Sequence, residues 1–322
     1  MYRSEKLKKL KGLISVILIF ITTVGCTNVA GDQLGDKNKK TIEVMDAADH
    51  TLNVPHNPQR VAVFDNAQID NLDALELGER ITATASSRLP HYLNKYNEVE
   101  VAGTLHEIDL EIAMATDPDL AIVATRSASS FDELSKYVPT LDFSLTKASA
   151  FKSMSYNFLE LSKIFDKEVK AQTILDELEN EKIALAQTAD ESKMTALMLM
   201  YNEGSLSVFG KNSRFSHVYD DFGFEPVDDQ IEASKHGMEI SYEYIIQKDP
   251  DVIFVLDRSA AISDNVDTSI PTSNFEENPL IEETKAYKNH QIIYLTPDAW
   301  YLSNGGVQAY QQMIEDVSSV FK

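Results

Sequence analysis

The stretch Asp117-Pro118-Asp119-Leu120-Ala121-Ile122-Val123, followed by Arg126-Ser127, recurs as Asp249-Pro250-Asp251-Val252-Ile253-Phe254-Val255, followed by Arg258-Ser259. A glutamate precedes each copy, Glu111 in the first and Glu243 in the second, and all of these positions are offset by 132 residues. A lone Asp-Pro-Asp would be only a common turn between a helix and a strand. Because a glutamate, a turn, a strand and an arginine keep one register, we predict an internal repeat.

Each copy predicts a helix, a proline-containing turn and a short buried strand. Apolar side chains recur at roughly helical spacing before Asp117 and Asp249, and a residue that precedes proline is driven out of the right-handed α region. The runs Leu120–Ala124 and Val252–Leu256 are continuously apolar, which is typical of strands covered on both faces of a parallel sheet. We therefore expect an α/β fold with two similar Rossmann-like lobes.

The lobes are expected over residues 41–150 and 191–322, joined by a helical region over 151–190. Phe151–Ala189 contains neither glycine nor proline and carries an apolar stripe, which predicts long helices, including a single rigid one between the lobes. An independent coiled coil is the alternative, but the stripe keeps no strict heptad.

Shorter elements are expected on either side of this region. In the first lobe we expect a turn around Asn53–Pro58 and a helix over Ala67–Leu77 with Gly78 as its C-cap. Further strands are expected over Thr41–Val44, Arg60–Phe64, Ile81–Thr84, Ala196–Tyr201, Leu206–Phe209 and Asn289–Leu295, and a terminal helix over Gln308–Phe321.

Residues 1–25 are predicted to be a signal peptide. Basic residues precede the apolar run Leu13–Ile21, which is too short to span a bilayer. Thr23-Val24-Gly25-Cys26 resembles the lipobox of bacterial lipoproteins, although the usual pattern has leucine where Thr23 stands. Cys26 is the only cysteine, so no intramolecular disulfide competes with its lipidation. A short hydrophobic anchor and an ordinary secretory signal are the alternatives.

Residues 26–40 are polar and without periodicity, which predicts a flexible tether. A lipidated Cys26 would anchor the chain to a membrane, with its body outside the cytoplasm, in the periplasm or at the cell surface. The net charge is −22, and removal of residues 1–25, which carry five basic residues and Glu5, leaves −26. Nucleic acid is a poor partner for so acidic a chain, because phosphate binding needs a basic surface.

Catalytic motifs are missing from the sequence. It contains no Gly-x-Ser-x-Gly elbow, no phosphate loop and no Gly-x-Gly-x-x-Gly fingerprint. His106-Glu107 is followed by Ile108-Asp109, so the zincin motif is absent, and the seven histidines include no pair at metal-ligand spacing. The sequence favours a binding protein over an enzyme.

Cations and aromatic residues fall in loops at the predicted edges of the lobes. Arg126 and Arg258 follow the carboxyl ends of the repeated strands, where open α/β sheets bind ligands. Taken singly, the arginines suggest surface salt bridges, His236 an exposed loop residue, and Trp300-Tyr301 ordinary packing. Together they predict a cleft for a flat anionic ligand, because guanidinium groups donate in a rigid fork and stack on rings. The set comprises Arg126, Arg214, Arg258, His236, Trp300 and Tyr301.

The chain resembles the ferric siderophore-binding lipoproteins of ABC importers from Thr41 to its end. Members of this family that bind catecholate and related siderophores, including petrobactin, enterobactin-type fragments and anguibactin, are the most similar. The resemblance implies two α/β lobes joined by one long helix and a monomer without a permanently bound cofactor. The ligand implied is a ferric catecholate or mixed catecholate–hydroxamate siderophore such as ferric anguibactin. The resemblance rests on Ser213-Arg214-Phe215, Lys235-His236-Gly237, Val255-Leu256-Asp257-Arg258 and the stretch from Ile293-Tyr294-Leu295 through Trp300-Tyr301-Leu302.

The resemblance also implies roles for individual residues. His236 and Tyr301 would complete the iron shell only where the siderophore leaves sites open, and a shift in alignment would put Tyr294 in place of Tyr301. Arg88 would lie near the lip of the cleft, at a position where relatives often have lysine. The siderophore's negative charge would be neutralised by an arginine triad, Arg126, Arg214 and Arg258.

Glu111 and Glu243 match the acidic residues, one per lobe, that dock onto arginines of the membrane permease. Their equal places in the two copies suit a two-fold symmetric permease. The alternative is that each glutamate is favoured only by the dipole at a helix N-terminus.

Other functions compete with siderophore capture. A haem or corrinoid receptor could use the same histidine and tyrosine. A zinc or manganese receptor would need several converging histidines and carboxylates. A surface lipoprotein acting as an adhesin or an envelope enzyme would not need the shared register of glutamate and arginine. A long connecting helix also predicts only small lobe motion, because it lacks a loop hinge.

Overall fold

The computed structural model describes residues 40–85, 88–146, 149–234, 236–262 and 275–322. The predicted signal peptide, Cys26 and all of the predicted tether except Lys40 lie outside the described residues. In the part that is described, none of the helices has the length and apolar character needed to cross a membrane.

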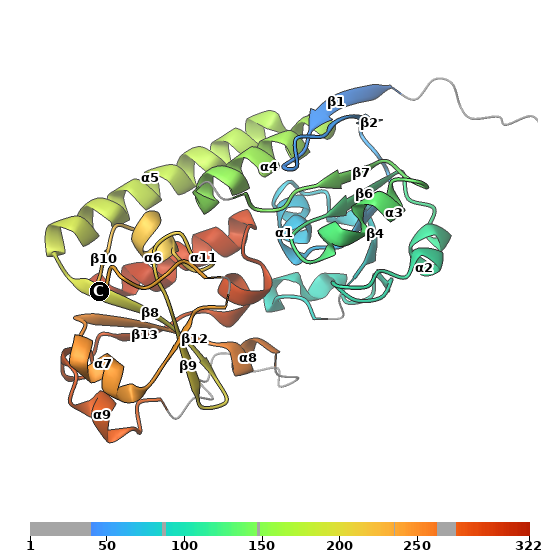
Figure 1. Cartoon of the computed structure of the whole chain (residues 1–322). Coiled ribbons are helices and arrows are strands. Elements are labelled where there is room, and N and C mark those ends of the chain that lie inside the picture. Colours follow the sequence, from blue (N-terminus) through green and yellow to red (C-terminus); the bar gives the residue numbers. More distant parts are fainter. Residues whose placement is uncertain (1–39, 86–87, 147–148, 235, 263–274) are drawn as a thin grey trace, which may run out of the picture. The chain divides into compact units, whose positions relative to one another are not determined.

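The N-terminal lobe is built on a five-stranded parallel sheet with the order β5-β4-β3-β6-β7 (Figure 1). All four residues of the predicted strand β6 are buried, as expected for a strand covered on both faces. An antiparallel hairpin, β1 (Thr41–Met45) with β2 (Thr51–Pro55), precedes the sheet. The sheet strands are β3 (Val61–Val63), β4 (Ile81–Thr84), β5 (Glu100–Val101), β6 (Leu120–Val123) and β7 (Thr140–Asp142).

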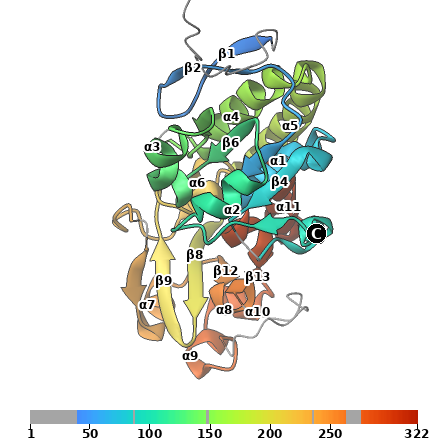
Figure 2. The same cartoon turned by 90° about the vertical axis from the view of Figure 1, so that its right-hand side faces the viewer.

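The C-terminal lobe has a mixed sheet with the order β11-β9-β8-β12-β13, and β10 also pairs with β8 (Figure 2). Strands β8, β12 and β13 are parallel, whereas β9 pairs antiparallel with β8 and β11. The two α/β lobes that the sequence predicts are thus confirmed. The strands are β8 (Thr195–Asn202), β9 (Ser205–Phe209), β10 (Glu225–Pro226), β11 (Met238–Ile240), β12 (Val252–Asp257) and β13 (Ile292–Tyr294).

The internal repeat is visible in the hydrogen bonds of its second aspartate. Asp119 N donates to Arg60 O at 2.7 Å, and Asp251 N donates to Thr195 O at 3.0 Å. The carboxylate of Asp119 accepts from Gln59 N and Arg60 N, and that of Asp251 accepts from Thr195 N and Oγ1. In each lobe the repeated aspartate therefore fixes the beginning of the neighbouring strand.

The first aspartate of each copy has the same backbone conformation. Helix α2 (Leu110–Ala115) ends two residues before Asp117, and helix α7 (Tyr242–Lys248) ends just before Asp249, its C-cap. The two aspartates have φ of 49° and 48°. Proline excludes the right-handed α region as predicted, but the residue before it takes the left-handed region, which aspartate tolerates, rather than an extended one.

Two helices connect the lobes, α4 (Ala150–Ile164) and α5 (Glu168–Ser192). The break between them falls at Asp166, whose φ is 56°, although the sequence offers neither glycine nor proline there. At 25 residues, α5 is about 38 Å long. It packs against α4 and α11 (Val307–Ser318), so it is no independent coiled coil.

One continuous apolar core joins both sheets to the connecting helices. The N-cap of α11, Gly306, offers no side-chain acceptor, and helix α1 (Asn66–Ala74) of the other lobe supplies one. Asp70 accepts from Gln308 N at 2.9 Å and from Ala309 N at 3.0 Å. A Cβ on Gly306 would lie 2.4 Å from Asp70 Cγ, so only glycine permits this approach.

Two local predictions were wrong. The predicted turn around Asn53–Pro58 begins too early, because Asn53 pairs with Glu43 inside the hairpin. Helix α1 ends at Ala74 rather than Leu77, and Glu76, not Gly78, takes the left-handed conformation behind it. Gly78 instead begins a 3-10 turn, Gly78–Arg80.

The remaining elements are short. Further 3-10 turns cover His91–Tyr96, Ser127–Ser130 and Ser319–Phe321, and a π-helix covers Asp298–Leu302. The other helices are α3 (Phe131–Leu134), α6 (His217–Asp220), α8 (Arg258–Ile262), α9 (Pro279–Glu282) and α10 (Lys285–Lys288).

Candidate functional site

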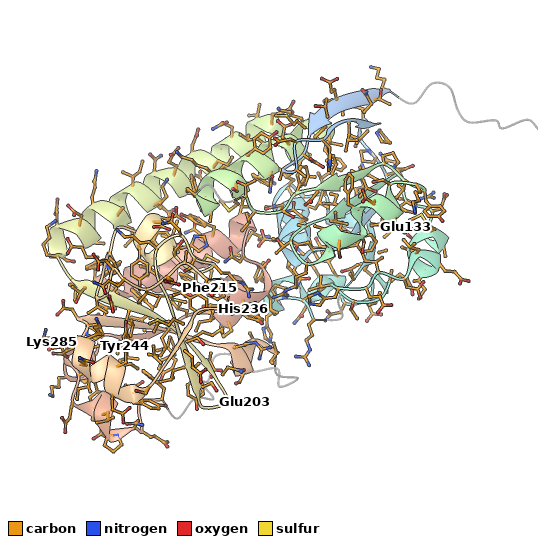
Figure 3. The ribbon with its side chains drawn as sticks, in the orientation of Figure 1. Glu133, Glu203, Phe215, His236, Tyr244 and Lys285 are labelled. Carbon is orange, nitrogen blue, oxygen red and sulfur yellow. The ribbon has the colours of Figure 1, made fainter. Side chains whose placement is uncertain are left out.

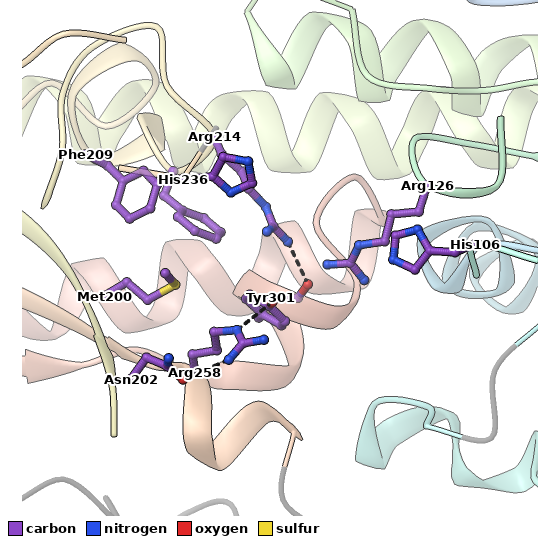
Figure 4. Close-up of a pocket in the computed structure, with 10 residues that line it drawn as sticks. His106, Arg126, Met200, Asn202, Phe209, Arg214, His236, Arg258 and Tyr301 are labelled. Carbon is purple, nitrogen blue, oxygen red and sulfur yellow. Dashed lines mark hydrogen bonds between the residues drawn. The ribbon is translucent and has the colours of Figure 1, made fainter. Parts of the chain in front are cut away.

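A cavity of about 500 Å³ brings together most of the residues predicted for the cleft (Figure 4). Its volume is within the range of small-molecule sites. Met200, Asn202, Phe209 and Phe215 form part of its wall (Phe215 is labelled in Figure 3). The residues that can carry charge or donate hydrogen bonds are His106, Arg126, Arg214, His236, Arg258 and Tyr301.

The repeat places two of the three arginines. Arg126 lies just beyond β6, and Arg258 is the first residue after β12. Both are interior strands with a neighbour on each side, and their carboxyl ends direct the following residues to the cavity. Both repeated arginines therefore line the same cavity.

Arg214 reaches the cavity from the loop after β9. Its Cζ lies 4.7 Å from the centre of the Phe215 ring, and its Nη2 donates to Tyr301 O at 3.1 Å. Asn304 donates in turn to Arg214 O at 3.4 Å. The loop that carries Arg214 is thereby joined to the segment that carries Tyr301.

Tyr301 stands at the centre of the arginine cluster. The Cζ atoms of Arg214, Arg126 and Arg258 lie 4.6, 5.5 and 5.7 Å from the centre of its ring. Arg258 Nε donates to its hydroxyl at 2.9 Å. Burial opposes ionisation of the phenol, but the hydrogen bond from Arg258 and the three positive charges together lower the pKa of Tyr301.

The three arginines leave an excess of positive charge in an acidic protein. Within the described residues, no carboxylate forms an ion pair with any of them, so the salt-bridge interpretation does not apply there. Burial, and then the charge of Arg126, lower the pKa of Arg214, which nevertheless stays protonated as guanidinium groups do in proteins. Such a cluster favours an anion that contacts several guanidinium groups at once.

Two histidines line the cavity. His236 is exposed, and its backbone N donates to Ser234 Oγ at 3.1 Å. His106 is also exposed and comes from the loop before α2. In the sequence, His106 served only to exclude a zincin motif, and its place in the cavity lining was not predicted.

The wall residues were not predicted either. Asn202 Oδ1 accepts from Arg258 Nη1 at 2.8 Å and so helps to orient the guanidinium. Phe215 stood beside Arg214 in the sequence, but nothing there distinguished it from a core residue. For His106, the only available signal was its place before the first repeated glutamate.

The sequence profile of a family described as "Periplasmic binding protein" matches residues 61–299. The chain belongs to the periplasmic binding protein family. Members of the family with known ligands are similar to it over nearly their whole length.

The petrobactin-binding protein YclQ of Bacillus subtilis is 35% identical over 97% of this chain and 98% of its own. Its crystal structure superposes with a TM-score of 0.82, covering 88% of this chain and 99% of that one. The ferric-anguibactin-binding protein FatB of Vibrio anguillarum is 31% identical over 92% and 93% of the two chains. The catecholate siderophore-binding protein VctP of Vibrio cholerae is 32% identical, with a TM-score of 0.80 and coverage of 87% and 100%.

Trp300 requires a correction against its predicted place in the cleft. Its side chain is fully buried, and its Nε1 donates to Asp316 Oδ2 at 2.9 Å. Its ring packs edge-on against His217, with the centroids 5.9 Å apart. Trp300 is therefore a packing residue of the core and does not line the cavity.

Two other candidates, Arg88 and Tyr294, are not among the residues that line the cavity. Arg88 is exposed, and its carbonyl oxygen accepts from Asn66 Nδ2 at 3.1 Å, but it is not part of the lining. Tyr294 packs beside the apolar cluster of the C-terminal sheet, whereas Tyr301 lines the cavity. The geometry therefore favours Tyr301 over Tyr294 as the tyrosine of the site.

The repeated glutamates occupy equal positions on two exposed helix starts. Glu111 lies in the first turn of α2 and Glu243 in the first turn of α7, and both side chains are exposed. Hydrogen bonds from Ser241 and from its own backbone N–H lower the pKa of Glu243. Both carboxylates are thus accessible from solvent and close to the positive end of a helix.

Proposed function

We propose that this protein captures a ferric siderophore and delivers it to an ABC permease for iron uptake. The observation that carries the proposal is the cluster of three arginines around Tyr301, without carboxylate partners among the described residues, in a cavity open to solvent. The names of YclQ, FatB and VctP support it, because each of these relatives binds a siderophore. The proposed role is binding and transport, without catalysis.

The chemistry of the site favours a catecholate or mixed catecholate–hydroxamate chelate, such as ferric anguibactin. Ferric iron held by such oxygen donors gives a chelate with flat rings and negative charge. Arg126, Arg214 and Arg258 would donate to its oxygens and stack on its rings. No resident cofactor is needed, since the iron arrives with its chelator as cargo.

His236 and Tyr301 are the proposed iron donors for a chelate that leaves coordination sites open. The lowered pKa of Tyr301 favours this role, because a phenolate is a hard oxygen ligand and ferric iron prefers such ligands. A siderophore that already supplies six donors would leave both residues as contacts to the chelate. Arg88 remains a proposed contact at the lip.

Delivery would use features outside the cavity. Glu111 and Glu243 are the proposed docking residues for the permease, and a lipid on Cys26 would hold the protein at the membrane, with its body outside the cytoplasm. We propose that it acts as a monomer, with residues 41–150 and 191–322 as the two lobes.

The direct test is a tryptophan fluorescence titration of the full chain in detergent micelles. Trp300 is the only tryptophan and adjoins Tyr301 in sequence, so a coloured ferric chelate in the cavity should quench it by energy transfer. The titrants are ferric anguibactin, a ferric bis-catecholate, a ferric tris-hydroxamate and haem. Saturable quenching by a catechol-containing chelate is expected. Quenching by haem alone would favour a haem receptor, and no quenching by any titrant would overturn the proposal.

A further inference from the structure

The loop between Gly103 and Ile108 holds His106 in the lining of the cavity. Gly103 and Ile108 form an antiparallel bridge, and Thr104 N donates to Glu107 O at 2.8 Å. Thr104 Oγ1 accepts from the backbone N–H of His106 and of Glu107. The backbone on both sides of His106 is therefore fixed by hydrogen bonds.

Gly103 makes this tight loop possible. Its φ is 89°, and a Cβ at this position would lie 2.3 Å from Glu107 O. Any other residue would force the loop open, because neither the dihedral nor the space admits a side chain. The imidazole of His106 has no hydrogen bond or ion pair within the described residues and is exposed to solvent at the cavity.

His106 and His236 hold similar places in the two lobes, each ahead of the helix that carries a repeated glutamate. His106 precedes α2 and Glu111, and His236 precedes α7 and Glu243. The two histidines are 130 residues apart, two fewer than the offset of the repeat, because the segments between histidine and helix differ in length. Each lobe thus contributes one histidine and one repeated arginine to the same cavity, and Figure 4 shows His106 and Arg126 entering from the N-terminal lobe.

We propose that His106 is a second ligand-binding histidine, which donates an imidazole N–H to an anionic oxygen of the ferric chelate. The inference rests on the proposed function. Among the lining residues, the N-terminal lobe supplies only His106 and Arg126, whereas Arg214, His236, Arg258 and Tyr301 come from the other lobe. His106 therefore doubles the number of polar side chains with which the N-terminal lobe holds the cargo. Imidazole can donate in its neutral form, so the contact does not require a further positive charge beside Arg126.

Affinity measurements on two matched variants test this contact. His106→Asn is compared with His290→Asn, since His290 is exposed and lies outside the cavity lining. Asparagine suits both positions because it tolerates the φ of 56° at His290. With a ferric bis-catecholate, His106→Asn is expected to bind about tenfold more weakly or worse, the usual worth of a hydrogen bond to a charged group, and His290→Asn to bind as the wild type does.

A second measurement follows the imidazole N–H of His106 directly in the complex. The gallium(III) analogue of the chelate is diamagnetic, so imidazole N–H signals can be followed by nuclear magnetic resonance, with the His106 signal assigned by its loss in His106→Asn. Protection of this N–H from exchange in the complex supports the proposal. Wild-type binding with an unchanged His106 signal and unchanged affinity in His106→Asn would overturn the role of His106 alone. Failure of the wild type to bind any of these chelates would overturn the proposed function, and this inference with it.

Discussion

Arg258 donates from Nε to the hydroxyl of Tyr301 at 2.9 Å, while its Nη1 donates to Asn202 Oδ1 at 2.8 Å. One guanidinium is thus fixed by two partners and holds the phenol in place. The same phenol has two further arginines near its ring. The acidity of Tyr301 is therefore a property of the cluster, and it can be measured without any ligand.

Tyr301 is expected to ionise at a lower pH than a free tyrosine, and Arg258→Gln is expected to move its pKa back up. Ultraviolet difference spectra of the tyrosinate, taken against Tyr301→Phe, isolate this group. Because its pKa is lower in the folded state, ionised Tyr301 contributes stability above its unfolded pKa, and that contribution is lost as the pH falls through the folded value. An unshifted titration in Arg258→Gln would contradict this account of the cluster.

Arg214→Ala combined with Arg258→Ala is expected to weaken binding of a ferric catecholate about a thousandfold or more, because each buried charged contact is worth about 2 kcal/mol or more. The fold should survive, since the double variant removes like charges that repel each other in the cavity. Isothermal titration calorimetry measures the loss of affinity, and circular dichroism checks that the fold survives. Arg80→Ala, outside the cavity lining, is the control. Equal affinity in the double variant and the control would rule out the arginine cluster as the site.

Glu111→Lys with Glu243→Lys should leave siderophore binding intact and abolish uptake, since both side chains are exposed and lie outside the cavity lining. Uptake of radioactive iron by cells that carry the variant measures the effect. Glu98→Lys with Glu191→Lys makes the same charge change at two other exposed positions and should transport normally. Normal import by the Glu111 and Glu243 variant would remove their docking role.

Asp70→Ala is expected to destabilise the protein by about 2 to 4 kcal/mol, because it removes a helix cap and leaves the buried N–H of Ala309 and the half-buried N–H of Gln308 without an acceptor. Urea unfolding measures the loss. Asp132→Ala, at an exposed position in the first turn of α3, should change stability little. Equal effects of the two changes would show that the contact between α1 and α11 adds nothing to stability.

Burial raises the pKa of Asp70 from 3.8 to about 6, despite hydrogen bonds from Tyr92 and the backbone of α11. Between these values the folded state binds more protons than the unfolded state, so the contribution of Asp70 to stability falls as the pH rises. Asp70→Asn should lack this part of the pH dependence. The difference between the two unfolding curves from about pH 4 to pH 6 tests the expectation, and parallel curves would contradict it.

The sequence predicted best where one local signal was strong. Continuous apolar runs identified β6 and β12, and their register placed Arg126 and Arg258 at one cavity. The different surroundings of Trp300 and Tyr301 could not be predicted in this way. The two residues are neighbours in sequence, yet one points into the core toward Asp316 and the other toward the arginines, because consecutive side chains of a helical turn diverge.

Two other residues could not be predicted because their roles depend on the three-dimensional arrangement of the chain. Asp70 looks like an ordinary polar residue of α1 until α11 is placed beside it, 238 residues away in sequence. His106 reaches the cavity only because Gly103 permits a tight loop there. Neither position is marked by periodicity or by a motif.

The contrast between a basic cavity and a chain of net charge −22 has a consequence for the kinetics of capture. An anionic chelate is repelled by the body as a whole and attracted only once it comes within about one screening length, about 8 Å at physiological salt, of the arginines. Added salt therefore speeds both steps, with opposite effects on affinity. It speeds the approach by screening the distant repulsion, and it speeds departure by weakening the hold of the guanidinium groups.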